Sequence, residues 1–302
     1  LYNNGILVRG SYLGMDGTLL ESTETKDDTT ISIEWFGTGQ KRWESKTTDG
    51  KVVSINRWHE DGKIRKELYD WEEEAIKDDN YYSDSRRPLN YIIKRPKVNF
   101  DKQDVLFFMH GHGGHIGYYE PHMINQFSDN YVKIILRAPY ETSLFSNKWT
   151  WFDFHISFSS DTTFNEEQIN SSCDAILFSI NKIIEKEKIN PKRIFVGGNS
   201  QGGIMACKLA LEHPDAIDGF IAHNSFMPIS YNVSTDESKY AKLKGLVING
   251  EFDETIDPIN SKHIANTFLK LGADIEKEEL KMGHEFPKIS RDVINEWMAQ
   301  NN

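Results

Sequence analysis

The sequence predicts an α/β fold with a mostly parallel central sheet, preceded by a small all-β region. From residue 89 onward, short apolar runs alternate with longer stretches of helical periodicity, whereas the first 78 residues hold only short alternating segments between turn signals. Strands that alternate with helices form a mostly parallel sheet covered on both faces. We therefore expect two domains in the 302 residues, a β region over 1–78 and an α/β domain over 79–302.

The β region is expected to be a meander of hairpins. Glycine follows a turn-forming residue at 38–39, 49–50 and 61–62, and the segments between these turns alternate apolar and polar side chains. Residues 34–44 also align with residues 57–67, with Glu-Trp-Phe-x-x-Gly matching Arg-Trp-His-x-x-Gly at an offset of 23 residues. This pattern resembles variant MORN-type repeats, which form open, single-layer hairpin arrays. Repeats of this size bury too little alone and must stack on their neighbours.

Four tryptophans in this region allow two interpretations. In a thin β array with few other large side chains, tryptophans form the core, and we favour this interpretation. The alternative is an exposed face that binds a carbohydrate, a lipid surface or a partner protein. The residues concerned are Trp35, Trp43, Trp58 and Trp71.

The strands and helices of the α/β domain follow from the apolar periodicity. The expected strands are 91–94, 105–109, 132–136, 194–196, 219–222, 246–248 and 275–280. The expected helices are 119–128, 166–188, 201–212, 258–271 and 287–299. Asn190-Pro191 ends the long helix before the strand at 194–196, because the residue before a proline disfavours the helical conformation.

Residues 194–206 join an apolar strand to an apolar helix through Gly-Gly-Asn-Ser-Gln-Gly. A Gly-x-Ser-x-Gly turn in this context is a nucleophile elbow, because the sharp turn projects the serine hydroxyl beyond the sheet and leaves no room for side chains two residues away. Gly198 and Gly202 meet that requirement. Ser200 is therefore the candidate nucleophile.

A serine nucleophile needs a base, and the base needs a carboxylate that fixes its tautomer. The expected strand at 275–280 is followed by a loop that contains Gly283 and His284, so His284 is the candidate base. A buried strand at 244–250 leads directly into four carboxylates, one of which should face the histidine. These are Glu251, Asp253, Glu254 and Asp257.

The strand at 105–109 opens into His-Gly-His-Gly-Gly-His at 110–115. Glycines after a central strand let backbone N–H groups turn toward a developing oxyanion. We expect the N–H groups of His112 and Gln201 to form this oxyanion hole. Metal binding by the three histidines is the disfavoured alternative, because the intervening glycines deny them the frame that ordinary zinc sites use. No metal and no other cofactor is expected.

Several motifs between residues 88 and 300 carry a family resemblance. They are the Gly-Gly-Asn-Ser-Gln-Gly-Gly elbow, Ala138-Pro139, Trp151-Phe152-Asp153, the segment 250–253 and Gly283-His284. Together they resemble the phospholipase/carboxylesterase family of α/β-hydrolases, which includes acyl-protein thioesterases.

The resemblance implies a set of roles. Ser200 would be the nucleophile, Asp253 the acid and His284 the base, with the N–H groups of His112 and Gln201 as the oxyanion hole. The choice of Asp253 among the four carboxylates rests on the resemblance. The family often has a leucine where His112 stands, which bears on the acyl group accepted.

Aromatic side chains crowd the segment 149–164. We expect Trp149 and Phe152 to line a substrate pocket, and ordinary core packing is the alternative interpretation. The segment 224–243 has only twenty residues, too few for a large lid. The site is therefore expected to be open to water and to bulky leaving groups.

Composition excludes some classes of partner. A net charge of −11 argues against a nucleic-acid partner, and no stretch approaches the length of an apolar transmembrane segment. Cys173 and Cys207 are expected to be buried and unpaired in helices. The chain begins at Leu1 without a leader pattern, and we expect its natural start to lie upstream. Cytoplasmic and secreted locations both stay open.

The sequence thus predicts a serine hydrolase that acts on small-molecule esters or acylated substrates. Carboxylic esters with small or medium acyl chains are the central expectation, with thioesters included. One alternative is a secreted feruloyl or acetyl esterase that acts on plant polysaccharide. The other is a hydrolase fold without activity whose repeats hold a partner protein or glycan, since fold alone does not fix function.

Overall fold

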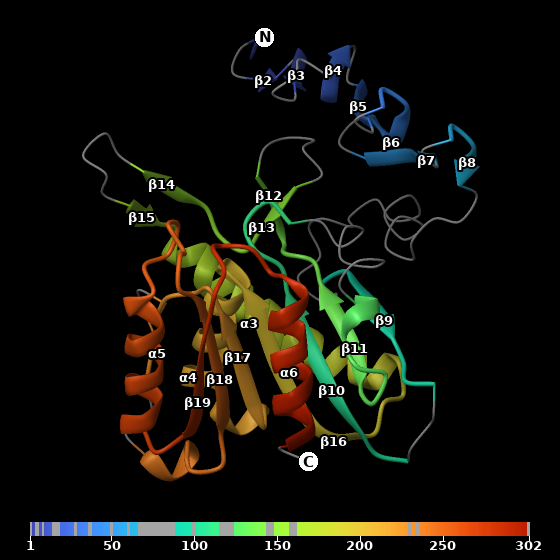
Figure 1. Cartoon of the computed structure of the whole chain (residues 1–302). Helices are drawn as coiled ribbons and strands as arrows, with labels where there is room; N and C mark the ends of the chain where they lie inside the picture. Colours follow the sequence, from blue (N-terminus) through green and yellow to red (C-terminus); the bar gives the residue numbers. More distant parts are fainter. Residues whose placement is uncertain are drawn as a thin grey trace. The chain divides into compact units, whose positions relative to one another are not determined.

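The computed structural model describes residues 2–3, 6–7, 9–13, 19–26, 29–35, 38–48, 51–58, 61–65, 88–97, 101–114, 124–142, 148–156, 162–228, 231–233 and 236–300. The chain divides into two compact units (Figure 1). One covers Leu1–Arg86, and the other covers Arg87–Thr142 and Lys148–Asn302.

The first unit is an antiparallel meander. Six of its described strands form one sheet in chain order, and two further short strands pair with each other. Gly39 and Gly62 lie in two of the turns with φ of 82° and 79°, a conformation that favours glycine, as their turn motifs predict. The predicted turn at 49–50 lies outside the described residues. The strands are β1 (Tyr2–Asn3), β2 (Ile6–Leu7), β3 (Arg9–Leu13), β4 (Leu19–Lys26), β5 (Thr29–Trp35), β6 (Lys41–Thr48), β7 (Lys51–Trp58) and β8 (Ile64–Arg65).

The tryptophans of this meander differ in burial. Trp43 is buried together with Ile55, whereas Trp35 and Trp58 are half-buried. Trp71 lies outside the described residues. Trp43 therefore packs as core, in agreement with the interpretation we favoured for this group of residues.

The second unit is built on a mixed, mostly parallel sheet of seven described strands, as the sequence predicts. Its strand order is β19-β18-β17-β16-β10-β11-β9, and all neighbours are parallel except β9 and β11. The inner strands are buried almost throughout, which explains why they read as apolar runs. The strands are β9 (Tyr91–Lys94), β10 (Gln103–Met109), β11 (Val132–Leu136), β16 (Pro191–Asn199), β17 (Gly219–His223), β18 (Lys244–Gly250) and β19 (Asp274–Leu280).

Helices cover both faces of this sheet. Figure 1 shows α6 (Lys288–Gln300) in front of the sheet and α3 (Glu166–Lys186) and α4 (Gln201–Glu212) behind it. The α4 helix packs on β10, β16 and β17, and α5 (Ile259–Lys270) packs on β18 and β19. Two small hairpins accompany this frame, β12 (Tyr140–Glu141) with β13 (Trp149–Thr150) and β14 (Phe154–Ile156) with β15 (Thr162–Phe164). Short 3-10 helices are η1 (Ile124–Gln126), η2 (Pro214–Ala216) and η3 (Glu237–Lys239).

One helix prediction is wrong where it can be compared. Of the stretch 119–128, the described part holds only the single turn η1, and residues 119–123 lie outside the described residues. The other four helices occur within two residues of their predicted bounds.

The two cysteines are buried and unpaired, as expected. Burial is the main cause that raises the pKa of the Cys173 thiol to about 12, and it also raises that of Cys207, so both stay protonated.

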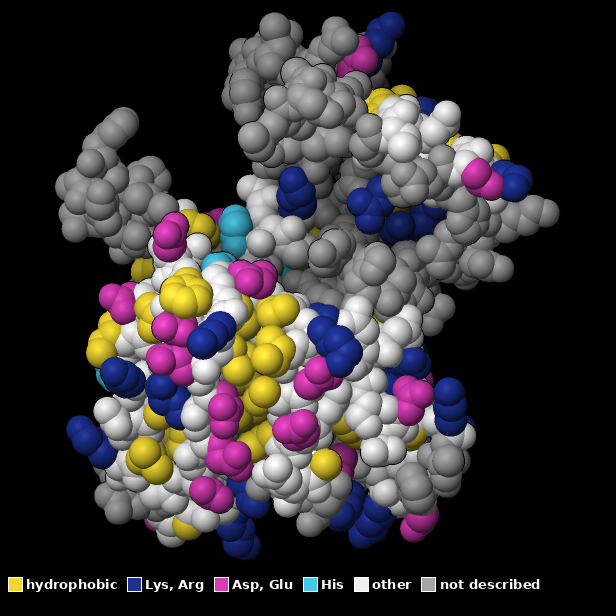
Figure 2. Space-filling view, viewed as in Figure 1, with side chains coloured by type: hydrophobic (Ala, Val, Ile, Leu, Met, Phe, Trp, Pro, Cys, Tyr) yellow, Lys and Arg dark blue, Asp and Glu magenta, His cyan; other side chains and the backbone are white. Residues whose placement is uncertain are grey.

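The visible surface of the second unit carries mixed charge. In Figure 2, acidic and basic side chains are interspersed over this unit, and the visible face has no continuous basic stripe. Among the described residues, no helix is both long enough and apolar enough to cross a membrane.

Candidate active site

Ser200 occupies a strained turn between β16 and α4. Its φ and ψ are 54° and −119°, a conformation that residues other than glycine rarely adopt. The surrounding backbone holds it there, because Ser200 N–H donates to the His223 carbonyl at 2.9 Å and the Ser225 hydroxyl donates to the Ser200 carbonyl at 2.9 Å. Strain of this kind at a strand-to-helix junction is typical of a nucleophile elbow.

The two glycines of the elbow are required by close packing. A Cβ on Gly198 would lie 2.3 Å from the Gly202 backbone, and a Cβ on Gly202 would lie 2.2 Å from the Met109 carbonyl oxygen. Both distances are far below van der Waals contact. The glycine spacing that singled out Ser200 in the sequence therefore has a direct steric cause.

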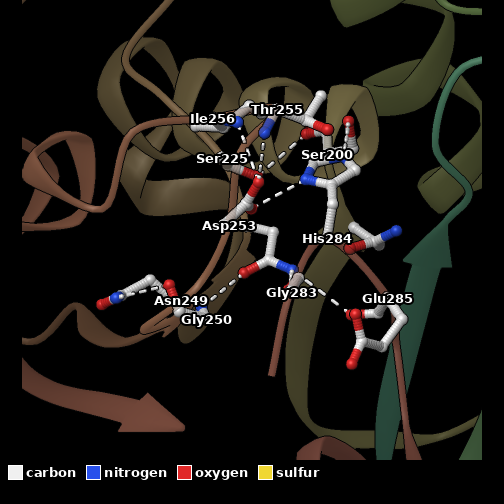
Figure 3. Close-up of polar contacts among 12 residues, drawn as sticks. Ser200, Ser225, Asn249, Gly250, Asp253, Thr255, Ile256, Gly283, His284 and Glu285 are labelled. Atoms are coloured by element: carbon white, nitrogen blue, oxygen red, sulfur yellow. Dashed lines mark hydrogen bonds and ion pairs between the residues drawn. The ribbon is translucent and has the colours of Figure 1, made fainter. Parts of the chain in front are cut away.

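The structure brings Ser200, His284 and Asp253 into one hydrogen-bonded chain (Figure 3). His284 Nε2 lies 3.1 Å from Ser200 Oγ, and His284 Nδ1 lies 2.7 Å from Asp253 Oδ2. The other carboxylate oxygen, Oδ1, accepts the backbone N–H groups of Thr255 and Ile256, both at 2.8 Å. The Asp253 side chain is only 1% exposed. The carboxylate is therefore fixed in orientation and faces the histidine.

The other three carboxylates of the acid loop have different surroundings. Glu251, Glu254 and Asp257 are exposed. Asp257 accepts the N–H of Ile259 at 2.9 Å at the start of α5. Of the four candidates from the sequence, Asp253 is the one that the structure joins to His284.

The first histidine of the predicted oxyanion loop supports the backbone. His110 Nδ1 donates to the Gly111 carbonyl at 2.7 Å, and its Nε2 accepts the N–H of Ala138 at 3.0 Å. Burial lowers the pKa of His110 to about 4, so the ring is neutral at pH 7. Gly111 lies against the nucleophile, since a Cβ there would be 3.3 Å from Ser200 Cβ. Both ring nitrogens of His110 are thus used in positioning this loop. The third histidine of the motif, His115, lies outside the described residues.

The side chains of His112 and Gln201 meet at the hydroxyl of Thr150. Thr150 Oγ1 lies 3.1 Å from His112 Nδ1, 2.9 Å from Gln201 Oε1 and 2.7 Å from the Phe152 carbonyl. Gln201 Nε2 also donates to that carbonyl at 2.8 Å. Burial lowers the pKa of His112, against an opposing effect from the charge of Asp153. Because Gln201 is the first residue of α4, its N–H has no partner within the helix.

The aromatic segment after β13 is mostly buried. Trp149 and Phe152 are 2% and 1% exposed and belong to the hydrophobic core, so a pocket-lining role for these two rings stays a prediction. Phe154 is 39% exposed, and its ring centroid lies 4.9 Å from that of His112. Phe164 connects Phe154 to Phe226, with centroid distances of 6.3 and 5.5 Å.

Sequence reasoning missed the polar residues at the end of β17 and directly after it. His223 is fully buried, and its Nδ1 donates to Asn199 Oδ1 while its Nε2 accepts the Ser290 hydroxyl, both at 2.8 Å. Burial is the main cause that lowers the pKa of His223 to about 3. The signal in the sequence is the run His-Asn-Ser at 223–225, which directly follows the predicted apolar strand at 219–222. The next residue, Asn224, contacts the loops of both Asp253 and His284.

Residues 93–301 match the model of a family described as phospholipase/carboxylesterase. A rice protein (Oryza sativa subsp. japonica) named as a probable inactive carboxylesterase is 27% identical over 155 residues, which are 50% of this chain and 62% of the rice protein. Lysophospholipase-like protein 1 of Mus musculus is 27% identical over 64% of this chain and 84% of its own length. Acyl-protein thioesterase 1 of Mycosarcoma maydis is 23% identical, with corresponding shares of 69% and 92%.

Solved structures show the same fold. The carboxylesterase of Bacillus cereus superposes with a TM-score of 0.59 at 16% identity, over 74% of this chain and 99% of the other. At this identity the likeness concerns the fold alone. The residues matched by the family model begin after the N-terminal meander.

Proposed function

This chain belongs to the phospholipase/carboxylesterase family, and on that premise we propose that it is a serine hydrolase that cleaves carboxylic esters through an acyl-enzyme on Ser200. The observation that carries the proposal is the hydrogen-bonded chain from Asp253 through His284 to Ser200. A carboxylate, an imidazole and a hydroxyl in this order form the arrangement that activates a serine.

The acylation step follows from this geometry. His284 Nε2 accepts the proton of Ser200 Oγ as the oxygen attacks the ester carbonyl, and the imidazolium that forms is stabilised by Asp253 at Nδ1. The protonated His284 then donates to the leaving alcohol or thiol. In the second half of the reaction, His284 takes a proton from the water that attacks the acyl-enzyme, and it returns this proton to Ser200 Oγ as the bond to the acyl group breaks and the acid leaves.

Backbone donors are proposed to stabilise the oxyanion. The N–H of Gln201 is at the N-terminus of α4, where the helix dipole also favours negative charge. The N–H of His112 would be the second donor, and the position of Gly111 against Ser200 supports this assignment. Thr150 links the side chains of the two residues, so the two donors would be held at a constant separation.

Small or medium acyl chains on an ester or thioester are the proposed substrates. The relatives named as a lysophospholipase-like protein and an acyl-protein thioesterase support esters and thioesters as the bonds cleaved. A second candidate is an ester of an aromatic acid, such as a feruloyl ester. It is favoured by the run of rings from His112 through Phe154 and Phe164 to Phe226, because aromatic rings pack well edge to face.

For the N-terminal region we propose a MORN-type repeat array over residues 1–78, separate from a catalytic domain over 79–302. The antiparallel meander and the positive φ of Gly39 and Gly62, which occupy matching places 23 residues apart, support it. A protein, a glycan or a lipid surface is the proposed kind of partner. Substitution of Trp35 and Trp58 by alanine, with binding to lipid vesicles and plant polysaccharides measured, tests this assignment.

The rice relative named as inactive makes an inert hydrolase fold the main competing function. Labelling with a fluorophosphonate separates the two, because only an activated serine reacts rapidly. We expect the parent protein to be labelled at Ser200 and Ser200→Ala to be unlabelled. A parent that resists labelling and fails to hydrolyse a panel of acetyl, hexanoyl, thioester and feruloyl substrates would exclude the esterase function.

A further inference from the structure

Asn224 joins three chain segments around the proposed catalytic chain. It follows β17 and is 1% exposed. Its Oδ1 accepts the N–H of Gly250 at 2.8 Å, and its Nδ2 donates to the carbonyls of Gly283 and Glu285 at 3.1 and 3.2 Å. Figure 3 draws Gly250, Gly283 and Glu285 beside the histidine and the acid. One carboxamide therefore satisfies one donor and two acceptors of the backbone.

These three backbone groups lie on the loops that carry Asp253 and His284. Gly250 is the last residue of β18, three positions before Asp253, and Gly283 and Glu285 flank His284 on both sides. The two loops are also in direct contact, since a Cβ on Gly250 would lie 2.4 Å from the Gly283 carbonyl oxygen. The carboxamide thus sets the separation of the loops at the place where the 2.7 Å bond between Asp253 and His284 must form.

The backbone of Asn224 is shaped for this contact. Its φ of 45° lies in the left-handed region, where asparagine is tolerated better than most residues. Its own N–H donates to the Ile248 carbonyl at 2.9 Å. The residue is therefore anchored to β18 by its main chain and to the histidine loop by its side chain.

We propose that Asn224 is a positioning residue that holds His284 in register with Asp253. This inference rests on the proposed serine hydrolase function for its effect on the rate, although the effect on geometry does not depend on it. Only a carboxamide presents an acceptor and two donor hydrogens in one small planar group. An aspartate would keep the bond from Gly250 but would set an oxygen against two carbonyl oxygens.

The test uses Asn224→Gly, because glycine adopts the left-handed backbone readily and removes the side chain that carries the carboxamide. Lys188→Gly is the matched control, since Lys188 also has a positive φ of 51° but lies exposed after α3. We expect Asn224→Gly to lower kcat for p-nitrophenyl acetate about 10-fold to 100-fold with little change in KM, since small misplacements of catalytic groups have effects of this size. Lys188→Gly should match the parent.

A second measurement is independent of activity. The Nδ1–H proton of a histidine held by a carboxylate gives a strongly downfield proton NMR signal, which we expect in the parent, in Lys188→Gly and in Ser200→Ala. This signal should be lost or broadened in Asn224→Gly. If the glycine variant does not fold, Asn224→Asp replaces it in the test and should show the same loss. A folded Asn224→Gly protein that keeps this signal and the parent kcat would overturn the inference. A parent that shows the signal but no labelling would contradict the hydrolase function alone, and the comparison of signals would still decide the role of Asn224.

Discussion

Replacing Asp253 by asparagine exchanges one oxygen for an NH2 group at a buried position. The environment decides which way the new carboxamide points. Thr255 and Ile256 both donate N–H groups to the Oδ1 position at 2.8 Å, so an oxygen is required there. The NH2 group then takes the Oδ2 position, 2.7 Å from His284 Nδ1.

This orientation reverses the tautomer of the histidine. An NH2 group can only donate to Nδ1, so the ring hydrogen must move to Nε2. His284 Nε2 would then donate to Ser200 Oγ and could not accept its proton. The opposite orientation of the carboxamide would forfeit two hydrogen bonds to the backbone, at about 1 kcal/mol each and more where donors are left buried.

The expected loss of catalytic rate in Asp253→Asn is large. Loss of the correct tautomer in a serine triad lowers kcat by about 10⁴-fold, which corresponds to about 5 kcal/mol of transition-state stabilisation. Asp253→Asn should therefore reduce the rate of fluorophosphonate labelling and of ester hydrolysis by roughly 10³-fold to 10⁴-fold. The effect should be no greater than that of Ser200→Ala or His284→Ala.

The matched control is Asp257→Asn, which makes the same change on the same loop at an exposed position. We expect it to stay within about threefold of the parent, because exposed substitutions have small effects. Second-order labelling rates for both variants, measured on folded protein, decide the outcome. A parent-like rate in Asp253→Asn, together with a large loss in Asp257→Asn or Glu251→Gln, would assign the acid to another carboxylate.

Three further changes test other parts of the proposal. Thr150→Val removes the hydroxyl between His112 and Gln201, and kcat for a short-chain ester should fall about tenfold with KM nearly constant. An unchanged kcat would show that Thr150 does not position the two oxyanion donors. The pKa of His223 is about 3 in the folded protein, below its usual value of about 6.5. As pH falls below about 6.5, the unfolded chain therefore binds a proton at His223 that the folded protein does not bind. The free energy of unfolding of the parent, from urea titration, should therefore fall by about 2 kcal/mol more than that of His223→Gln between pH 7 and pH 5, and equal slopes would contradict this. A chain that starts at Asp79 should remain soluble and hydrolyse a small ester at close to the parent rate, whereas an aggregated product would show that the two units need each other.

The α/β sheet was predictable because its inner strands are buried on both faces and therefore form apolar runs in the sequence. The edge strand β19 is mostly exposed or half-buried, and alternation of its side chains gives its position. The steric demands of the elbow give Ser200. Strand bounds were less predictable, as β16 illustrates: it begins at Pro191 instead of the predicted residue 194. The missing part holds Arg193, which pairs with Asp104 through two hydrogen bonds of 2.9 and 2.6 Å. In the sequence alone, Arg193 resembles a loop residue, because the aspartate that pairs with it on the neighbouring strand is 89 positions away in the chain.

The wrong helix at 119–128 has a similar cause. Lys133 is completely buried, and its Nζ donates to the Ser128 carbonyl at 2.7 Å and to the Phe127 carbonyl at 3.4 Å. Those carbonyls are used by a side chain from β11, so the described part of the segment needs no more than one helical turn to satisfy its backbone. Periodicity records apolar spacing, but it carries no information about a lysine that arrives from the next strand.

The candidate site also contains a residue, Asn224, that the sequence alone does not identify. In a parallel sheet the carboxyl ends of neighbouring strands meet at one edge, and ligand sites form there. That rule collects the His110 loop, Ser200, His284 and the acidic segment 251–257 from the sequence, because each follows a recognisable strand with a residue type of known chemistry. The choice of Asp253 within the acidic segment came from the family resemblance. It applies equally to the residues after β17, but asparagine has no single chemical role that would single it out. The importance of Asn224 arises from two backbone carbonyls 59 and 61 residues further along the chain, and only the packed loops bring these within reach of its side chain.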